Sequence, residues 1–262
     1  MRACYHTHTS RCHHASGTDE QYVLSAIDRG VKVLGFSCHA PMLYPGGYES
    51  YYKMKPSELS EYVESVLSLK EKYKDKIEIK LGLEAEFYPE LHTESIELWK
   101  KFPIDYLILG QHFVDKEYDE NKDAAPWASE DKGRVTAYVD RVIAAMELGI
   151  FTVFAHPDLI NYTGDDGEFY EGEMRRIIAS AIRCGVYLEY NLLGQSAKRA
   201  YPVAKFWQYV AEMGAKVVIG CDAHSPDRVA KEEEISEATE FLSGLGITPV
   251  DEIQLISPFA SK

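Results

Sequence analysis

The sequence predicts a single α/β domain built on a parallel sheet, and three observations support this prediction. Strand-like and helix-like segments alternate seven times along 262 residues, without a linker or a break in composition. Such alternation calls for parallel strands joined by right-handed crossovers. The length is typical of one α/β barrel. Finally, histidines or carboxylates follow most predicted strands, where the active site of a closed barrel lies.

The first half of the chain supplies four predicted strands, at 1–8, 31–37, 77–87 and 104–112. The second is largely apolar, as expected for a strand buried on both faces of a parallel sheet, and the third alternates between apolar and polar residues, as a strand does. The predicted helices cover 18–29, 57–73 and 93–101. The first should begin at a capping box of Thr18 and Gln21, and Gly30 should end it.

The second half continues the alternation after a long polar segment, 114–133, which lacks periodicity and predicts a loop. Loops of this length are often lids, and Tyr118 and Trp127 offer rings that would cover a small substrate. The remaining predicted strands are 151–156, 186–191 and 216–221, and the remaining predicted helices are 135–148, 172–184, 203–213 and 226–242.

Composition excludes several classes of function. The net charge is −14 with acidic residues spread along the chain, which argues against nucleic acid or an anionic membrane as a partner. No window approaches the roughly 20 apolar residues of a membrane span, and Met1 enters a predicted strand without a signal-peptide pattern. Five cysteines with no CxxC pair favour a reduced, cytoplasmic setting. The oligomeric state stays open.

The histidines carry the strongest functional signal. His6 and His8 are two residues apart on a predicted strand, so both imidazoles leave the backbone on the same side. Taken alone, such a pair is more often a chance surface feature than a metal site. The other candidates also lie at or near strand ends: His14, His39, Glu84, His112, His156, Asp222 and His224. We expect His13 to be only a neighbour of the site and His92 to lie outside it.

This set is too large for one tetrahedral zinc ion, which takes four ligands. Shared out with a bridging carboxylate and waters, it suits two or three metals. Several metals close together suit phosphoester hydrolysis, because they bind phosphate oxygens, activate a bridging water and stabilise the leaving oxygen.

These residues resemble the polymerase and histidinol phosphatase (PHP) superfamily. The similarity extends over essentially the whole chain, and the local sequences GLEAEF at 82–87 and DAHSP at 222–226 resemble its histidinol-phosphatase branch. The resemblance implies one domain, residues 1–262, folded as a distorted seven-stranded (β/α)7, TIM-like barrel with three metals. It implies a first metal on His6, His8, Glu84 and Asp222, a second on Glu84, His112 and His156, and a third on His14, His39 and His224.

The sequence departs from the family pattern at two places. Cys38 stands where family members commonly have Asp before the histidine of the second strand. The branch usually has basic residues after the histidine of the fifth strand and after the Asn-x-x-Gly of the sixth, but this chain has 159–162 (LINY) and 194–197 (GQSA). Lys198 and Arg199 follow closely and are the candidate substitutes for binding substrate, since a guanidinium suits phosphate. A solvated helix start explains them equally well.

The sequence therefore predicts a metal-dependent phosphatase acting on L-histidinol phosphate or a similarly small phosphomonoester. The expected cofactors are three divalent ions, Zn, Fe or Mn, and the expected nucleophile is a metal-bound hydroxide. Glu84, Asp222 and His224 are the predicted catalytic residues, with Asp222 or His224 protonating the leaving alkoxide. One alternative is a different phosphoester, such as a nucleotide-derived one, which the missing basic pair favours. A non-catalytic metal-binding domain is a further alternative, against which the full ligand set argues.

Overall fold

Seven parallel strands form the centre of the computed structural model, which describes residues 1–259. They are neighbours in chain order: β1 (Ala3–Cys4), β2 (Val33–Phe36), β3 (Glu78–Ala85), β4 (Tyr106–Leu109), β5 (Val153–Phe154), β6 (Tyr187–Asn191) and β7 (Val217–Gly220). A parallel bridge between Thr7 and Ala223 brings the first and last strands together. The sheet is therefore a nearly closed, distorted (β/α)7 barrel, as the sequence predicts.

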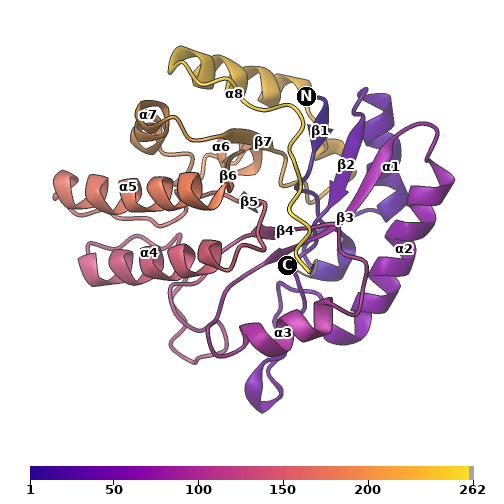
Figure 1. The fold of residues 1–262 in the computed structure, drawn as a ribbon, viewed down its shortest axis with the longest axis horizontal. Coiled ribbons are helices and arrows are strands. Elements are labelled where there is room, and N and C mark those ends of the chain that lie inside the picture. The colour runs from indigo at the N-terminus through magenta and orange to yellow at the C-terminus, as the bar shows by residue number, and fades with distance from the viewer. Residues whose placement is uncertain (260–262) are drawn as a thin grey trace.

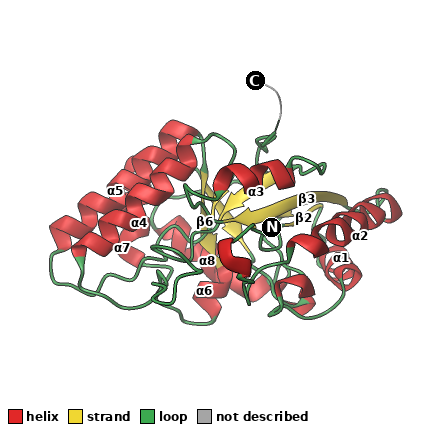
Figure 2. Ribbon diagram, turned by 90° about the horizontal axis from the view of Figure 1, so that it is seen from below, coloured by secondary structure: helices red, strands yellow, loops and turns green. Residues whose placement is uncertain are grey.

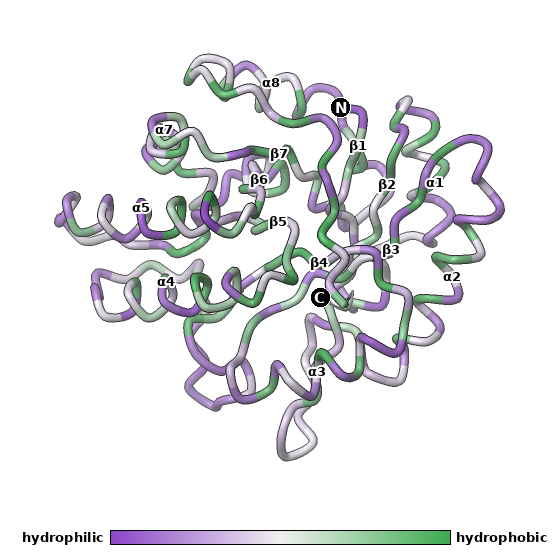
Figure 3. Tube along the Cα trace, viewed as in Figure 1, coloured by the Kyte–Doolittle hydropathy of each residue, from purple (hydrophilic) through white to green (hydrophobic). Residues whose placement is uncertain are grey.

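Helices surround the strands (Figures 1 and 2), as crossover connections require. They are α1 (Asp19–Asp28), α2 (Leu59–Lys72), α3 (His92–Trp99), α4 (Lys132–Glu147), α5 (Gly167–Cys184), α6 (Leu192–Ser196), α7 (Ala204–Met213) and α8 (Glu232–Gly244). Apolar and polar residues alternate along α4 and α5 (Figure 3), so each buries one face.

The capping box that begins α1 is confirmed. Thr18 N donates to Gln21 Oε1 over 2.8 Å, and the Thr18 hydroxyl accepts from Gln21 N over 3.3 Å. The boundaries of other elements differ from prediction. Helix α4 begins three residues before the predicted start, where Asp131 accepts hydrogen bonds from Gly133 N and Arg134 N. Helix α6 was not predicted, because a single turn is too short to show periodicity.

The C-terminal segment crosses the end of the barrel opposite the histidines. Ile253 packs with Tyr5, Tyr106 and Tyr187 in the barrel interior, and Val250 N donates to the carbonyl at the start of β7. With that end covered, the carboxyl ends of the strands are the open rim. No helix within residues 1–259 is long and apolar enough to cross a membrane.

Candidate metal centre

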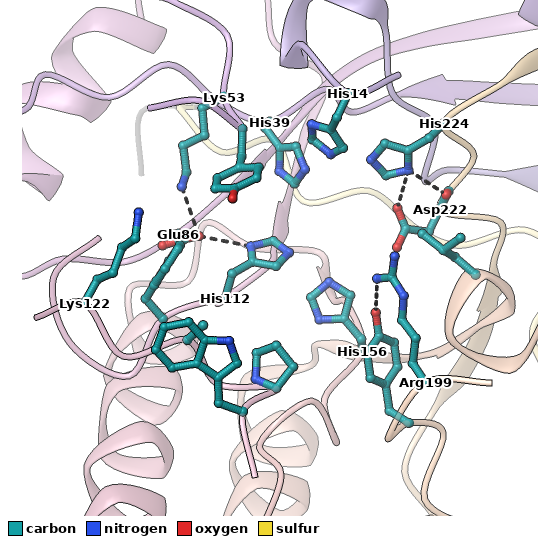
Figure 4. A pocket seen from close by; sticks show the side chains of 17 residues that line it. His14, His39, Lys53, Glu86, His112, Lys122, His156, Arg199, Asp222 and His224 are labelled. Carbon is teal, nitrogen blue, oxygen red and sulfur yellow. Dashed lines mark hydrogen bonds and ion pairs between the residues drawn. The ribbon is translucent and has the colours of Figure 1, made fainter. Parts of the chain in front are cut away.

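Strand ends and the loops after them bring the predicted metal ligands to one place. His6 and His8 follow β1, His39 follows β2, and Glu84 lies near the end of β3. His112, His156 and the pair Asp222 and His224 follow β4, β5 and β7, and His14 lies in the loop before α1. Figure 4 shows the rim with His14, His39 and His224 on one side of the cavity and His112 and His156 on the other. The predicted ligand set is thus brought together.

Four donor atoms converge most closely at the centre of the rim. His6 Nε2 and His8 Nε2 are 3.1 Å apart, and each lies 3.5 Å from Glu84 Oε2. Asp222 Oδ1 lies 3.5 Å from His6 Nε2 and 3.1 Å from His8 Nε2. Ligands bound tetrahedrally at 2.0–2.1 Å from zinc are about 3.3 Å from one another. The spacing of these four atoms therefore fits a shared metal ion.

Glu84 lies between two groups of imidazoles. Its Oε1 atom is 3.3 Å from His156 Nε2 and 3.7 Å from His112 Nε2, on the side away from His6 and His8. Both carboxylate oxygens are buried, and neither accepts a hydrogen bond of good geometry within residues 1–259. A buried carboxylate without hydrogen bonds is costly unless a cation binds it. The arrangement fits a bridging ligand.

The third predicted ligand set is looser. The ring centres of His14 and His224 are 4.6 Å apart, and that of His39 lies 5.3 Å from His14. His14 Nδ1 and His224 Nδ1 bond to the carbonyls of Cys12 and Asp222, which leaves each Nε2 lone pair available to a metal. His39 Nδ1, however, lies 2.8 Å from Glu84 Oε2 and so faces the centre of the rim.

The electrostatics of the rim favour bound cations. Burial opposes a charge on His6, yet the carboxylates of Glu189, Asp222 and Glu84 outweigh it and raise the pKa of His6 well above its usual value. Burial lowers the pKa of His39 to about 3, so that imidazole is neutral and free to bind metal. Positive charge is stabilised at the centre while neutral imidazoles surround it.

Two ligands have unusual backbone conformations. His156 has φ of 35° and Asp222 has φ of 47°, in the left-handed region that non-glycine residues seldom adopt. Such conformations cost about 1–3 kcal/mol each and cluster at functional sites. Gly110 serves the same centre, because a Cβ there would lie 1.9 Å from Glu84 Oε1.

The sequence reasoning missed two buried carboxylates behind the ligands. Glu189 Oε2 lies 2.7 Å from His6 Nδ1, and Glu86 Oε1 lies 3.0 Å from His112 Nδ1. A carboxylate on the second ring nitrogen fixes the tautomer and orientation of a metal-binding histidine. Their signal was a Glu among apolar residues, within β6 in YLEYN at 187–191 and just after β3 in GLEAEF at 82–87.

Glu189 and Glu86 belong to larger buried networks. Asn191 Nδ2 donates to Glu189 Oε1 over 2.7 Å and to Asp222 Oδ2 over 3.1 Å, which links two strands behind the metal ligands. On the other side, Lys53 Nζ lies 3.1 Å from Glu86 Oε1 and also pairs with Glu117. Charges at such buried positions require partners, and each of these has one.

A cavity of about 410 Å³ opens above the ligands. Of the two predicted substrate-binding residues, only one contributes to its lining. Arg199 lines it and donates to the Tyr201 hydroxyl over 2.8 Å, whereas Lys198 is exposed and is not part of the lining. The predicted lid contributes Lys122, Ala124, Pro126 and Trp127. Tyr118 instead donates to Glu90 outside the cavity.

Cys38, where the family pattern commonly has Asp, is buried beside another thiol. Thr9 Oγ1 donates to Cys38 Sγ over 3.2 Å, and the sulfurs of Cys12 and Cys38 lie within 4.8 Å of each other and of a His8 nitrogen. His8 Nδ1 itself is buried without a hydrogen-bond partner in residues 1–259. His8 therefore lacks the carboxylate support that His6 has.

A barrel rim that holds clustered imidazoles around a buried carboxylate is the arrangement of a metal-dependent hydrolase. The model of the PHP domain family matches residues 5–192, which is more than half of the chain. The chain belongs to the PHP family.

Several of the similar proteins are histidinol-phosphatases or probable histidinol-phosphatases. The probable histidinol-phosphatase of Deinococcus radiodurans is 30% identical over 230 residues, covering 86% of each chain. That of Schizosaccharomyces pombe is 27% identical, over 93% of this chain and 86% of its own. The crystal structure of histidinol phosphate phosphatase from Lactococcus lactis, complexed with zinc, L-histidinol and phosphate, has a TM-score of 0.72 at 18% identity and covers 95% of both chains. The chain is thus a histidinol-phosphatase-like, metal-dependent phosphatase.

Proposed function

We propose that this protein hydrolyses L-histidinol phosphate with three divalent metals. The observation that carries the proposal is Glu84, a buried carboxylate with imidazole nitrogens against both oxygens. We assign the first metal to His6, His8, Glu84 and Asp222, the second to Glu84, His112 and His156, and the third to His14, His39 and His224. The bound zinc, L-histidinol and phosphate of the Lactococcus lactis protein support the choice of substrate and of zinc as one metal.

The metals would supply charge neutralisation at the phosphate and activation of water at neutral pH. The protein's own groups set the geometry. Glu84 holds two ligand groups at a fixed separation, and Glu189 and Glu86 orient His6 and His112. Arg199 reaches the cavity, where its guanidinium would bind a phosphate oxygen.

The leaving alkoxide needs a proton, and Asp222 and His224 are the proposed donors at the cavity wall. His224 Nδ1 lies 3.0 Å from its own strand-end carbonyl, Asp222 O, and that contact requires the proton on Nδ1. Nε2 then has only a lone pair, which favours a ligand role for His224. Asp222, which carries no proton of its own as a metal-binding carboxylate, would then pass on a proton taken from solvent.

A second candidate is hydrolysis of a different small phosphomonoester. The positions where the family branch usually has basic residues hold Leu159 and Ile160, both buried in the core. Of the proposed substitutes, only Arg199 lines the cavity. The side chains at the cavity therefore restrict the identity of the substrate less than the metal ligands restrict the type of reaction.

The test is a screen of purified, metal-reconstituted protein against a phosphomonoester panel that includes L-histidinol phosphate. We expect turnover with added manganese or zinc, abolished by a chelator and restored by metal, with L-histidinol phosphate preferred. Turnover of another ester at a much higher kcat/KM would overturn the proposed substrate but support the proposed phosphatase reaction. No turnover of any ester at full metal content would overturn both.

A further inference from the structure

One side of the cavity offers groups that the metal centre does not use. Lys122, Pro126 and Trp127 line it together with Phe113, and Tyr52 belongs to the same lining. Trp127 is 55% exposed and Tyr52 is 50% exposed, although large aromatic side chains are usually buried. Figure 4 shows Lys122 on the side of Lys53 and Glu86, with Arg199 across the rim beyond His112 and His156. An occupied cavity would bury this aromatic surface.

The 122–127 segment is held firmly against a metal ligand. Ala125 N donates to the carbonyl of His112 over 2.8 Å, and Asn161 N donates to the carbonyl of Ala125 over 3.1 Å. Arg134 Nε contacts both oxygens of Asp123, at 2.9 and 2.8 Å, and the Asn161 side chain donates to Pro126 O over 3.1 Å. The segment therefore has a fixed position beside the metal centre, although it lies in a predicted lid.

The two charged side chains on this side, Glu86 and Lys122, differ in how many partners they have. Glu86 is already engaged by Lys53, His112 and Tyr88. Lys122 Nζ has no ion-pair partner or side-chain hydrogen bond in residues 1–259 and is half-buried at the cavity. This side thus presents a flat apolar face and a free donor, but its one acidic side chain is already paired. It suits a ring that carries a hydrogen-bond acceptor and suits an ammonium group poorly.

We propose that Trp127 and Lys122 form the leaving-group subsite, which selects phosphomonoesters whose alcohol carries a flat ring with a hydrogen-bond acceptor, such as a neutral imidazole. The inference rests on the proposed function and assigns the residues that recognise the ring of its substrate. The ring stacks on Trp127 while Lys122 donates to a ring nitrogen. The metals and Arg199 then need to hold only the phosphate.

The kinetic test compares two phosphate esters that share an amine beside the ester carbon. L-Histidinol phosphate carries a ring, and O-phosphoethanolamine does not. Trp127→Ala should lower kcat/KM for the ring substrate about two- to tenfold, from lost stacking. Lys122→Met should lower it about ten- to a hundredfold, from one charge-assisted hydrogen bond. Neither should change kcat/KM for O-phosphoethanolamine by more than about twofold, and Trp127→Phe should retain most of the preference.

Two control variants keep the comparison specific. Tyr51→Ala removes an aromatic ring that is 77% exposed but not part of the cavity lining, and Lys116→Met removes a cation from the same loop outside the cavity. Neither should alter the ratio of the two kcat/KM values. Equal losses on both substrates in the Trp127 and Lys122 variants would show that the segment only supports the fold and would overturn the subsite.

A binding measurement separates this proposal from the proposed function. Trp99 and Trp207, the other tryptophans, are buried at 2% and 0% exposure, so a ligand in the cavity should perturb mainly the emission of Trp127. We expect L-histidinol to change the fluorescence of the metal-loaded wild-type protein and not that of Trp127→Phe. No change in the wild type would overturn the subsite even if the phosphatase is active. A change without turnover of any ester would keep the subsite and overturn the proposed function.

Discussion

The floor of the cavity and the wall formed by the 122–127 segment differ in how fully their polar groups are engaged. On the floor, His6, Glu84 and Asp222 are each at most 5% exposed, and carboxylates support His6 and His112 from behind. On the wall, Lys122 lacks an ion-pair partner in the described part of the chain and Trp127 is 55% exposed. The polar groups of the floor are arranged around metal ions. The groups of the wall, together with Arg199, instead face the part of the cavity where a substrate would bind.

The difference shows how the molecule divides its tasks. Ligands held by buried networks keep their geometry when the substrate changes, because shifting them would break several hydrogen bonds. Half-exposed side chains on a braced loop can be exchanged without disturbing those networks. One site can therefore retain phosphoester hydrolysis while its leaving-group preference varies.

The largest expected effect is on the floor. Glu84→Gln should abolish nearly all phosphatase activity and lower the number of bound metals, because an amide nitrogen cannot bind a cation. Elemental analysis and turnover of an aryl phosphate measure both quantities. Glu78→Gln, at the exposed start of the same strand, is the matched control and should leave both unchanged. Full metal content and full turnover in Glu84→Gln would show that Glu84 is not a bridge.

A second change tests whether the floor loads its metals as one unit. His39→Ala should remove one metal equivalent and keep two, since the spacing of His14, His39 and His224 is looser than that around Glu84. Elemental analysis of the purified protein gives the count, with His92→Ala, which lies outside the centre, as the control. Loss of all metals together, or of none, would contradict the separate third site.

A smaller effect is expected behind the floor. Glu189→Gln should weaken metal affinity about ten- to a hundredfold while the fold stays intact, because His6 loses the carboxylate that orients its ring. Competition with a chromogenic chelator measures the affinity, and circular dichroism checks the fold. Glu240→Gln, on the exposed face of α8, is the control. An unchanged affinity would mean that Glu189, with Asn191 and Gly220 around it, contributes only to the packing of the barrel and not to metal binding.

The sequence predicts the floor much better than the wall, for a physical reason. Strand alternation and the rule that active sites lie at carboxyl ends of barrel strands place His6, Glu84, His112 and Asp222 together without knowledge of any contact. The wall depends on how a loop folds. Nothing in the spacing of 114–133 tells that Trp127 lines the cavity while Tyr118 packs elsewhere, because loops lack a period.

The hydrogen-bond networks behind the floor are predicted from the sequence less well than the metal ligands but better than the wall. A buried Glu within an apolar strand signals a partner, but the sequence does not identify it. His6 and Glu189 are 183 residues apart and meet only because barrel closure brings β1 near β6 and β7. The same limit applies to Lys53, whose pairing with Glu86 and Glu117 joins two loops to the residue that follows β3.

Arg199 and Lys198 adjoin in sequence but differ in position, and of the two Lys198 has the smaller expected effect. Arg199→Ala should lower kcat/KM for L-histidinol phosphate about ten- to a hundredfold, the worth of one charge-assisted hydrogen bond. It should cost about as much on a small aryl phosphate, because both esters present the same phosphate group to Arg199. Lys198→Ala should change neither value by more than about twofold, because Lys198 is exposed and outside the cavity lining. Steady-state kinetics of the two variants on both esters decide the question. If Arg199→Ala behaves like Lys198→Ala on both, the metals alone hold the phosphate, and preference for one ester over another must come from the 122–127 segment.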